Sequence, residues 1–313
     1  MNPTPELNFT GERFTPECVR EIWYEHWHRY AFARSLAAGR RVLDAACGEG
    51  YGSAILAVDA ASVLGVDIDA LAIAHASTRY GDQTNLHFER ADATALHVTP
   101  GSIDLVVSFE TLEHVEAQDA LVNGFASALT EEGLLLISCP DKAVYSDAAG
   151  FQNEFHVREL YRDELLSLLG RYFPHVRLYG QKLLFQSVIW GDGSAAGSHH
   201  AVTAHADRSL TDGLDYAPVY FLALCSRRPL PDDLPGLSLF GDRDESVYSH
   251  YNHEIRKNMA AGKRIAELEA ELADLRRRPA DDVLESADRG PHPDPSVSTV
   301  AWWRRWLARK PHD

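Results

Sequence analysis

Short apolar runs alternate with segments of helical spacing along the first half of the chain. In those segments apolar residues recur every three or four positions, which predicts helices over residues 17–38, 51–60, 69–80 and 117–129. The strand-like runs between them are RVLDAA, SVLGVDI, NLHFERAD, IDLVVSF and GLLLISCP. IDLVVSF is a continuous apolar run, as expected for a strand that is covered on both faces. This alternation predicts an α/β fold with a doubly wound parallel sheet.

The second half continues with a helical pattern over 160–169 and strands at HVRLYGQ and VYFLALCS. The polar segment 191–215 is predicted to be a mobile loop. Beyond Pro229 a proline-punctuated connection leads into a helix over 243–278. Its apolar seam is short, so residues 255–276 either pair with a second copy or pack on their own domain. The seam consists of Ile265, Leu268, Leu272 and Leu275.

The C-terminal region changes composition twice. Residues 279–299 are rich in Pro, Asp and Ser and are predicted to be a disordered linker. In the tail, 300–313, three tryptophans share one broad face of a short helix beside four basic residues. Such a segment suits a membrane surface or an anchoring partner, bound through 300–310, or docking on the protein's own acidic body. The predicted organisation is an α/β domain over 1–228, a linker and helix over 229–278, then the disordered linker and the tail.

The composition of the chain limits the binding partners and the cellular compartment that we expect. The formal net charge of −16 argues against nucleic-acid binding, which rewards a basic face. No apolar run approaches the ~20 residues of a membrane span. The N-terminal residues lack the basic-then-apolar layout of a secretory signal. We therefore expect a cytoplasmic protein, with its tail at the inner face of the membrane if it binds lipid.

Cysteine and histidine spacing predicts no metal site. The four cysteines have no C-x-x-C spacing and are expected to be free thiols in a reducing compartment. They are Cys18, Cys47, Cys139 and Cys225. Three of the 15 histidines, His199, His200 and His205, lie in a Gly/Ser/Ala-rich loop and are expected to be solvated.

The stretch VLDAACGEGYG places an aspartate and three glycines at the end of the first predicted strand. Asp44 ends the strand, and Gly48, Gly50 and Gly52 follow before the next helix. A glycine lets a ligand approach the backbone without meeting a Cβ. The location predicts a nucleotide-type loop, although the G-x-G-x-G spacing differs from the G-x-G-x-x-G of dinucleotide sites.

The next three strands also end in polar residues. Asp67, in GVDID, lies about 20 residues after the loop, where an acidic side chain accepts hydrogen bonds from ribose hydroxyls. Asp69 fits the alternative role of capping the following helix. Asp92, in RADA, could accept from an adenine amine. The fourth strand leads into SFETLEHV, which places polar groups at the mouth of the same crevice.

These motifs, in this order, resemble class I S-adenosylmethionine-dependent methyltransferases over about residues 11–228. The resemblance rests on VLDAACGEGYG, GVDID, RADATAL, DLVVSFETLEHV and GLLLISCP. It implies a seven-stranded, mostly parallel sheet whose last strand is antiparallel. It also implies that the Gly48–Gly52 loop wraps the methionine part of the cofactor and that Asp67 holds the ribose. Ile68 would pack on the adenine, Asp92 and Ala93 would read its edge, and Glu110 would lie beside the sulfonium.

A narrower resemblance concerns the methyl acceptor. FTGERFTPE, HWHRYAFA, CGEGYGSA, VSFETLEHV and NEFHVREL are similar to bacterial methyltransferases associated with cell-surface polysaccharides. This implies a sugar or glycan hydroxyl as acceptor. Ubiquinone-type O-methyltransferases share LEHV, so a small aromatic or quinone hydroxyl is an alternative. A cofactor-binding scaffold without catalysis is a third interpretation.

Two histidines are candidates for the base that a hydroxyl acceptor requires. His114 lies in LEHV and His156 in NEFHVREL, and we expect one of them to take the proton. The alternatives are that His114 orients its loop and that His156 lies at a helix entry. Arg29, with Tyr30, closes over the cofactor carboxylate or is a surface cation over a core aromatic. Asp44 contacts the cofactor amino group or supports the glycine loop.

Overall fold

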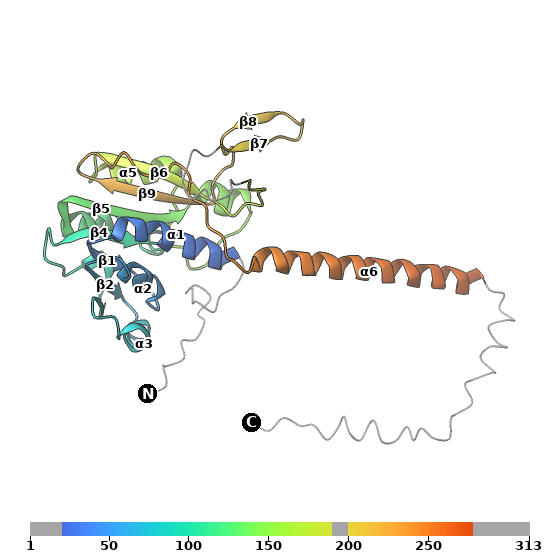
Figure 1. Cartoon of the computed structure of the whole chain (residues 1–313), viewed down its shortest axis with the longest axis horizontal. Helices are drawn as coiled ribbons and strands as arrows, with labels where there is room; N and C mark the ends of the chain where they lie inside the picture. Colours follow the sequence, from blue (N-terminus) through green and yellow to red (C-terminus); the bar gives the residue numbers. More distant parts are fainter. Residues whose placement is uncertain (1–20, 190–199, 278–313) are drawn as a thin grey trace, which may run out of the picture. The chain divides into compact units, whose positions relative to one another are not determined.

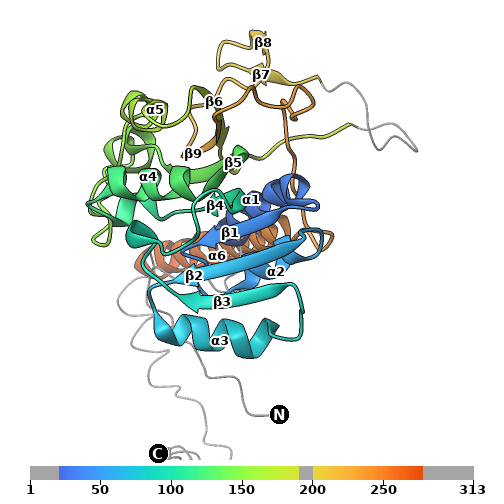
Figure 2. The same ribbon diagram turned by 90° about the vertical axis from the view of Figure 1, so that its left-hand side faces the viewer.

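The computed structural model describes residues 21–189 and 200–277. Its main sheet has seven strands in the order β3-β2-β1-β4-β5-β9-β6, and the first five follow one another in Figure 2. Strand β9 is antiparallel to both of its neighbours, whereas the pairs from β3 to β5 are parallel. The predicted doubly wound, mostly parallel sheet with an antiparallel last strand is confirmed. The strands are β1 (Arg41–Ala45), β2 (Ser62–Asp67), β3 (Leu86–Arg90), β4 (Ile103–Ser108), β5 (Leu129–Pro140), β6 (His175–Gln181) and β9 (Tyr220–Ser226).

Helices cover both faces of this sheet (Figure 1). Successive side chains of a strand point to opposite faces, so Val42 packs with α1 and α2 while Leu43 packs with α4 and α5. Helix α3 packs along β2 and β3. The central strands therefore need apolar residues on both faces, which explains their continuous apolar runs. The helices are α1 (Glu21–Ala37), α2 (Tyr51–Ala57), α3 (Ala70–Tyr80), α4 (Gln118–Ala128) and α5 (Arg162–Gly170).

The chain reverses its direction across the sheet between β1 and β4. Strand β1 pairs with β2 on one side and with β4 on the other, which makes the β1/β4 boundary the topological switch point. Two non-glycine residues just past these strands have a left-handed backbone, Ala46 at φ 63° and Glu110 at φ 49°. Such residues are uncommon and cluster at functional sites. Topology and backbone geometry thus both indicate the carboxyl ends of β1 and β4.

The polar segment after β6 is more ordered than expected where the structure describes it. Residues 202–204 and 210–212 form a hairpin, β7 (Val202–Ala204) and β8 (Leu210–Asp212). The Thr203 hydroxyl donates to the carbonyl oxygen of Gly213 at 2.8 Å, which closes the hairpin. The prediction of a loop without strands is therefore wrong at 202–204 and 210–212, and the predicted mobility stays a prediction. These strands are too short to produce a hydrophobic period that sequence could reveal.

The chain after β9 returns to α1 before the last helix begins. The Phe240 ring lies 5.5 Å from those of Trp23 and His28, and the hydroxyl of Ser238 lies 2.9 Å from Nε2 of His28. Helix α6 (Ser246–Arg277) follows, and from Tyr248 onward it belongs to a second compact unit.

The four seam residues of α6 are exposed. Pairing of 255–276 with a second copy therefore stays a prediction. Among the described residues, no helix has the length and apolar character needed to cross a membrane. Cys18, His199, the linker 279–299 and the tail 300–313 lie outside the described residues, so predictions about them also stay predictions.

Candidate cofactor and reaction site

Asp44 connects the first strand to the two helices on one face of the sheet. Its side chain is fully buried, and its carboxylate accepts hydrogen bonds from the hydroxyls of Ser53 at 2.6 Å and Tyr30 at 3.1 Å. Burial raises the pKa of Asp44 to about 6. Ser53 and Tyr30 lie on α2 and α1. This geometry favours the interpretation that Asp44 supports the glycine loop.

Glycine occupies the three positions of the loop for different structural reasons. A Cβ on Gly52 would lie 2.0 Å from the Tyr30 ring, and one on Gly50 would lie 2.7 Å from Phe88 and Ala76. Packing of the protein on itself therefore requires glycine at both positions. Gly48, at φ 58°, has no atom of the described residues within 4 Å of the position that a Cβ would take. Only Gly48 matches the expectation that a bare backbone leaves room for a ligand.

Asp67 is held at the end of β2 by two main-chain donors. The amide of Gly48 donates to its Oδ2 and the amide of Asp69 to its Oδ1, both at 2.9 Å. Each carboxylate oxygen has a second lone pair, so the ribose contact predicted for Asp67 stays chemically available. Ile68 beside it is 63% exposed. Asp69 caps α3 by accepting from the amide of Leu71 at 2.8 Å, as the alternative role predicted.

Asp92 is fixed in the same way at the end of β3. Its Oδ1 accepts from the amide and the hydroxyl of Thr94 at 2.8 and 2.7 Å, which caps a short turn over Ala93–Ala95. An adenine amine would therefore be accepted by Oδ2. We call the group of Asp44, Gly48, Asp67, Ile68 and Asp92 the β1–β3 rim.

Arg29 projects from α1 and is almost completely buried. Its Nε donates to the Gln181 side chain at 2.7 Å, and its guanidinium lies 4.5 Å from the centre of the Tyr220 ring. Nη1 lies 3.7 Å from Oε1 of Glu110, but neither Nη1 nor Nη2 has a hydrogen-bond partner among the described residues. Arg29 is thus no surface cation. Buried donors of this kind require an acceptor, and a carboxylate would supply one.

Glu110 lies two residues after the end of β4 and is oriented by Ser138 of β5. Its Oε1 accepts from the hydroxyl of Ser138 at 2.6 Å, and its amide donates to the same hydroxyl at 3.1 Å. The left-handed backbone of Glu110 turns the following segment, Leu112–His114, back across the strand ends. This turn places His114 next to a segment that is distant in sequence.

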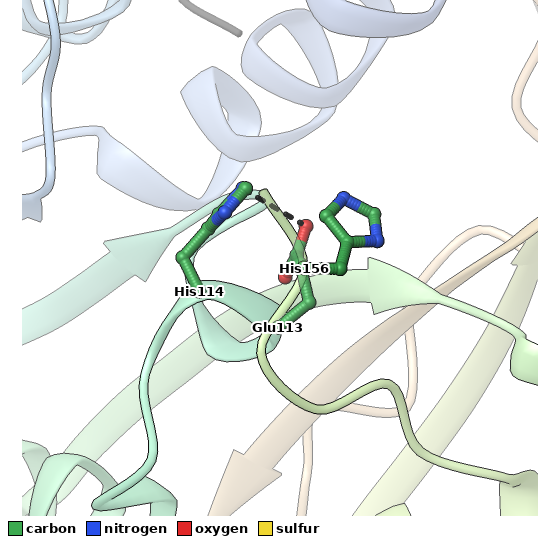
Figure 3. Close-up of side chains that lie close together, drawn as sticks. All are labelled: Glu113, His114 and His156. Atoms are coloured by element: carbon green, nitrogen blue, oxygen red, sulfur yellow. Dashed lines mark ion pairs between the residues drawn. The ribbon is translucent and has the colours of Figure 1, made fainter. Parts of the chain in front are cut away.

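His114 and His156 come together, with perpendicular rings 5.0 Å apart (Figure 3). Nδ1 of His114 donates to the carbonyl oxygen of Phe155 at 3.1 Å, because a carbonyl can only accept. Nδ1 of His156 lies 2.6 Å from Oε1 of Glu159, and its Nε2 lies 3.0 Å from the Asn153 amide nitrogen. Helix α5 begins six residues after His156, so this histidine is not at a helix entry.

Glu113 lies between the two histidines (Figure 3). It is 1% exposed, and neither carboxylate oxygen has a hydrogen-bond partner among the described residues. Oε1 lies 3.9 Å from Nε2 of His114. Burial raises the pKa of Glu113 well above its usual range. We call Arg29, Glu110, Glu113, His114 and His156 the β4 rim.

Several residues of the β4 rim and its supports escaped sequence reasoning. Glu113 lies inside the quoted LEHV motif, and its position beside a candidate histidine was the available signal. No signal in the sequence pointed to Gln181, Tyr145 or Tyr220. They come to the β4 rim only because the topology brings β6, β9 and the segment after β5 there. The Tyr145 ring stacks on His156 at 5.3 Å and lies 5.9 Å from Tyr220.

A cavity of about 620 Å³ adjoins Arg29. Its walls come from α1, β6 and residues 214–222 and 236–240. Charged side chains and aromatic rings both line it, and burial raises the pKa of Glu25 on its wall to about 7. The lining includes Glu25, Arg29, Asp141, Tyr179, Tyr216 and Phe240.

Comparison with known proteins identifies the domain. Residues 42–133 match a family model described as "Methyltransferase domain". A Mycobacterium tuberculosis protein named "Probable S-adenosylmethionine-dependent methyltransferase" is 37% identical over 166 residues, covering 52% of this chain and 60% of its own. Phosphoethanolamine N-methyltransferase 1 of Arabidopsis thaliana is 30% identical over 151 residues, covering 48% of this chain and 28% of its own.

The ubiquinone biosynthesis O-methyltransferase of Cupriavidus pinatubonensis is 34% identical over 104 residues, covering 32% of this chain and 41% of its own. The chain thus spans about 60% of the length of the mycobacterial relative. The matched segment contains the glycine loop, Asp67, Asp92, Glu110 and Glu113–His114. These matches show a methyltransferase domain over residues 42–133, and the strand order shows an α/β fold with a seven-stranded sheet.

Proposed function

We propose that the protein transfers a methyl group from S-adenosylmethionine to a hydroxyl oxygen of a sugar or glycan. The observation that carries this proposal is the position of the β4 rim. Buried Arg29 and the histidine pair lie at the switch point, directly beside the strand end that carries Glu110. A methyl donor and an acceptor must meet at one place, and this boundary is where both sets of polar groups converge.

The β1–β3 rim would hold the nucleoside. Asp67 accepts from the ribose hydroxyls with its second lone pairs, Ile68 packs on the adenine, and Asp92 with Ala93 contacts the adenine edge. Gly48 leaves room for the methionine part, and Nη1 and Nη2 of Arg29 donate to its carboxylate. The donor set suits this cofactor because it combines acidic acceptors for hydroxyls with a buried cation for an anion.

Methyl transfer depends mainly on alignment and on removal of the acceptor proton. When bound, S-adenosylmethionine supplies a methyl group already activated on a sulfonium. His114 and His156 are the catalytic residues, placed to contact the acceptor hydroxyl. Because Nδ1 of His114 carries a proton, the neutral ring has its lone pair on Nε2, the nitrogen nearer Glu113. Glu159 and Phe155 orient the two rings.

The cavity beside Arg29 supports a sugar as acceptor. Its charged groups suit hydroxyls, and its aromatic rings offer flat apolar faces to a sugar ring. The relative named for ubiquinone biosynthesis keeps a quinone hydroxyl as the second candidate, because leucines also line the cavity. A scaffold without catalysis would not need a half-buried histidine pair at the switch point. Association of the tail with the inner membrane face stays part of the glycan proposal.

Turnover measurements test this proposal. The full chain would be incubated with S-adenosylmethionine and either lipid-linked glycans or hydroxylated quinones, and S-adenosylhomocysteine would be quantified. We expect methylation of the glycan and a loss of at least tenfold in His114→Ala and His156→Ala. His205→Ala, in the hairpin, is the matched control and should keep its rate. Wild-type turnover in both site variants, or methylation of the quinone alone, would overturn the assignment.

A further inference from the structure

We propose that Glu113, His114 and His156 bind a divalent transition-metal ion. One ligand atom from each residue lies within 4.8 Å of the others, and Figure 3 shows the carboxylate between the two rings. Two atoms that each lie ~2.1 Å from one ion are at most about 4.2 Å apart. The 3.9 Å between Oε1 of Glu113 and Nε2 of His114 already fits this limit. A separation of 4.8 Å must shorten by at least about 0.6 Å to meet this limit, which side-chain rotation would supply.

The surroundings of both rings match those of metal-binding histidines. Such histidines usually donate one N–H to a carboxylate or a carbonyl, which leaves the other nitrogen for the ion. Nδ1 of His156 contacts the carboxylate of Glu159, and Nδ1 of His114 contacts the carbonyl of Phe155. Nε2 of His156 accepts from the Asn153 amide at 3.0 Å, and the ion would replace this hydrogen bond.

Glu113 supplies the independent evidence for a cation. Glu113 is 1% exposed and its carboxylate has no hydrogen-bond partner in residues 21–189 and 200–277, and such a group is costly to bury unless a cation or a donor compensates it. Glu110 and Glu159 add negative potential around it, and Arg29 supplies positive potential. A bound divalent ion would balance these charges and give both oxygens of Glu113 a ligand role.

The two segments that carry the ligands are already fastened together. The amides of Val157 and Arg158 donate to the carbonyl oxygen of Glu113 at 2.8 and 3.0 Å. The buried side chain of Gln118 donates to the carbonyl oxygens of Leu112 and Arg158, both at 2.8 Å. An ion would therefore find its ligands held in place by backbone contacts.

One carboxylate and two imidazoles favour Mn²⁺, Fe²⁺, Co²⁺ or Zn²⁺ over Mg²⁺, which prefers oxygen ligands. The role of the ion rests on the proposed function. Three protein ligands leave coordination positions open, and an acceptor hydroxyl bound there would lose its proton to water more readily. The resulting oxygen forms the new bond to the methyl carbon as the carbon–sulfur bond breaks, and its electron pair stays on sulfur. In the ion-bound site the Nε2 lone pairs of His114 and His156 hold the ion, so water takes the proton in place of a histidine.

Ion binding can be measured without turnover. The full chain would be stripped with a chelator and titrated with Mn²⁺, with free Mn²⁺ followed by electron paramagnetic resonance. We expect one ion per chain and an affinity at least tenfold lower in Glu113→Gln and His156→Ala. His205→Ala is the control, and circular dichroism confirms that each variant is folded. The absorption spectrum of the Co²⁺ form reports nitrogen ligation and should change in His156→Ala.

Binding no tighter in the wild type than in the two site variants would overturn the ion site. Full turnover by stripped protein that binds no Mn²⁺ would also overturn it and would leave methyl transfer standing. Specific Mn²⁺ binding without turnover on any hydroxyl acceptor would support the ion site and count against the proposed function.

Discussion

The polar side chains of the β1–β3 rim and the β4 rim find their partners in opposite ways. On the β1–β3 rim, Asp44, Asp67 and Asp92 all accept hydrogen bonds from the protein itself. On the β4 rim, Arg29 and Glu113 are buried with polar atoms that have no hydrogen-bond partner among the described residues. The first rim is therefore complete without a ligand. The second pairs Arg29 with Glu110 but leaves polar atoms of Arg29 and Glu113 without hydrogen-bond partners in the described part of the chain, and bound groups would supply them.

Gly52→Ala, in the glycine loop next to the β1–β3 rim, should have the largest effect on stability. The new Cβ would lie 2.0 Å from the Tyr30 ring, so α1 and the loop must shift. We expect the free energy of unfolding to fall by about 3 kcal/mol, measured by denaturant titration. Gly48→Ala is the matched control. Its Cβ would meet no atom of residues 21–189 and 200–277 within 4 Å. The variant should lose only ~1 kcal/mol for its left-handed backbone and should bind S-adenosylmethionine more weakly. Equal destabilisation by both substitutions would contradict the division between packing and ligand glycines.

Asp67→Ala tests whether the β1–β3 rim, whose carboxylates already accept hydrogen bonds from the protein, also binds a ligand. Loss of charge-assisted hydrogen bonds to ribose should weaken S-adenosylmethionine binding by about 1.5–3 kcal/mol, or roughly 10- to 100-fold in calorimetry. Asp69→Ala is the control, because it removes a helix cap worth ~1 kcal/mol and should leave the affinity within about twofold. An affinity unchanged in Asp67→Ala would remove Asp67 from the site.

Glu113→Gln should stabilise the ion-free protein, as expected for an uncompensated charge. A carboxyl whose folded-state pKa lies above its ordinary value of 4.5 binds its proton more tightly when folded. Stability from Glu113 is therefore present at low pH and is lost as the pH rises from about 4.5 through the folded-state pKa. We expect the variant to gain about 1–2 kcal/mol relative to wild type at pH 7 after chelation.

Unfolding at pH 4 to 8 measures this difference. Asp44, whose pKa is raised to about 6, gives a slope of the same sign in both proteins, so the difference isolates Glu113. Added Mn²⁺ should stabilise the wild type and not the variant. A variant less stable than the chelated wild type at pH 7 would show that Glu113 is already compensated within the protein.

Ile68→Ala should have the smallest effect. The side chain is 63% exposed, so the free energy of unfolding should change by less than ~0.5 kcal/mol. Lost contact with the adenine should weaken cofactor binding by about 1 kcal/mol, a few-fold in calorimetry. A destabilised variant with unchanged affinity would mean that Ile68 packs on the protein.

The same contrast explains what the sequence could predict. The β1–β3 rim is local, because each carboxylate follows a strand of clear apolar pattern and the glycine loop links two neighbouring elements. Its positions could therefore be predicted. The packing reasons for glycine at positions 50 and 52 could not be predicted, because they depend on the Tyr30 ring and on the contact of α3 and β3 with the loop.

The β4 rim joins residues that are far apart in the chain. Arg29 meets Gln181 across 152 positions, and His114 meets Phe155 across 41. Only the antiparallel insertion of β9 brings Tyr220 beside them, and no local pattern encodes such a pairing. His114 and His156 were found because each lies in a recognisable motif. The role of Glu113 could not be predicted, because its burial without a hydrogen-bond partner in the described part of the chain is a property of the fold.

Direct binding of the cofactor tests the central claim most simply. The full chain would be titrated with S-adenosylmethionine, and separately with S-adenosylhomocysteine, in a calorimeter. Binding at the β1–β3 rim predicts one molecule of either compound per chain, with a large loss of affinity in Asp67→Ala and in Gly48→Ala. No heat with either compound, or equal affinity in wild type and both variants, would contradict the placement of the cofactor at this crevice.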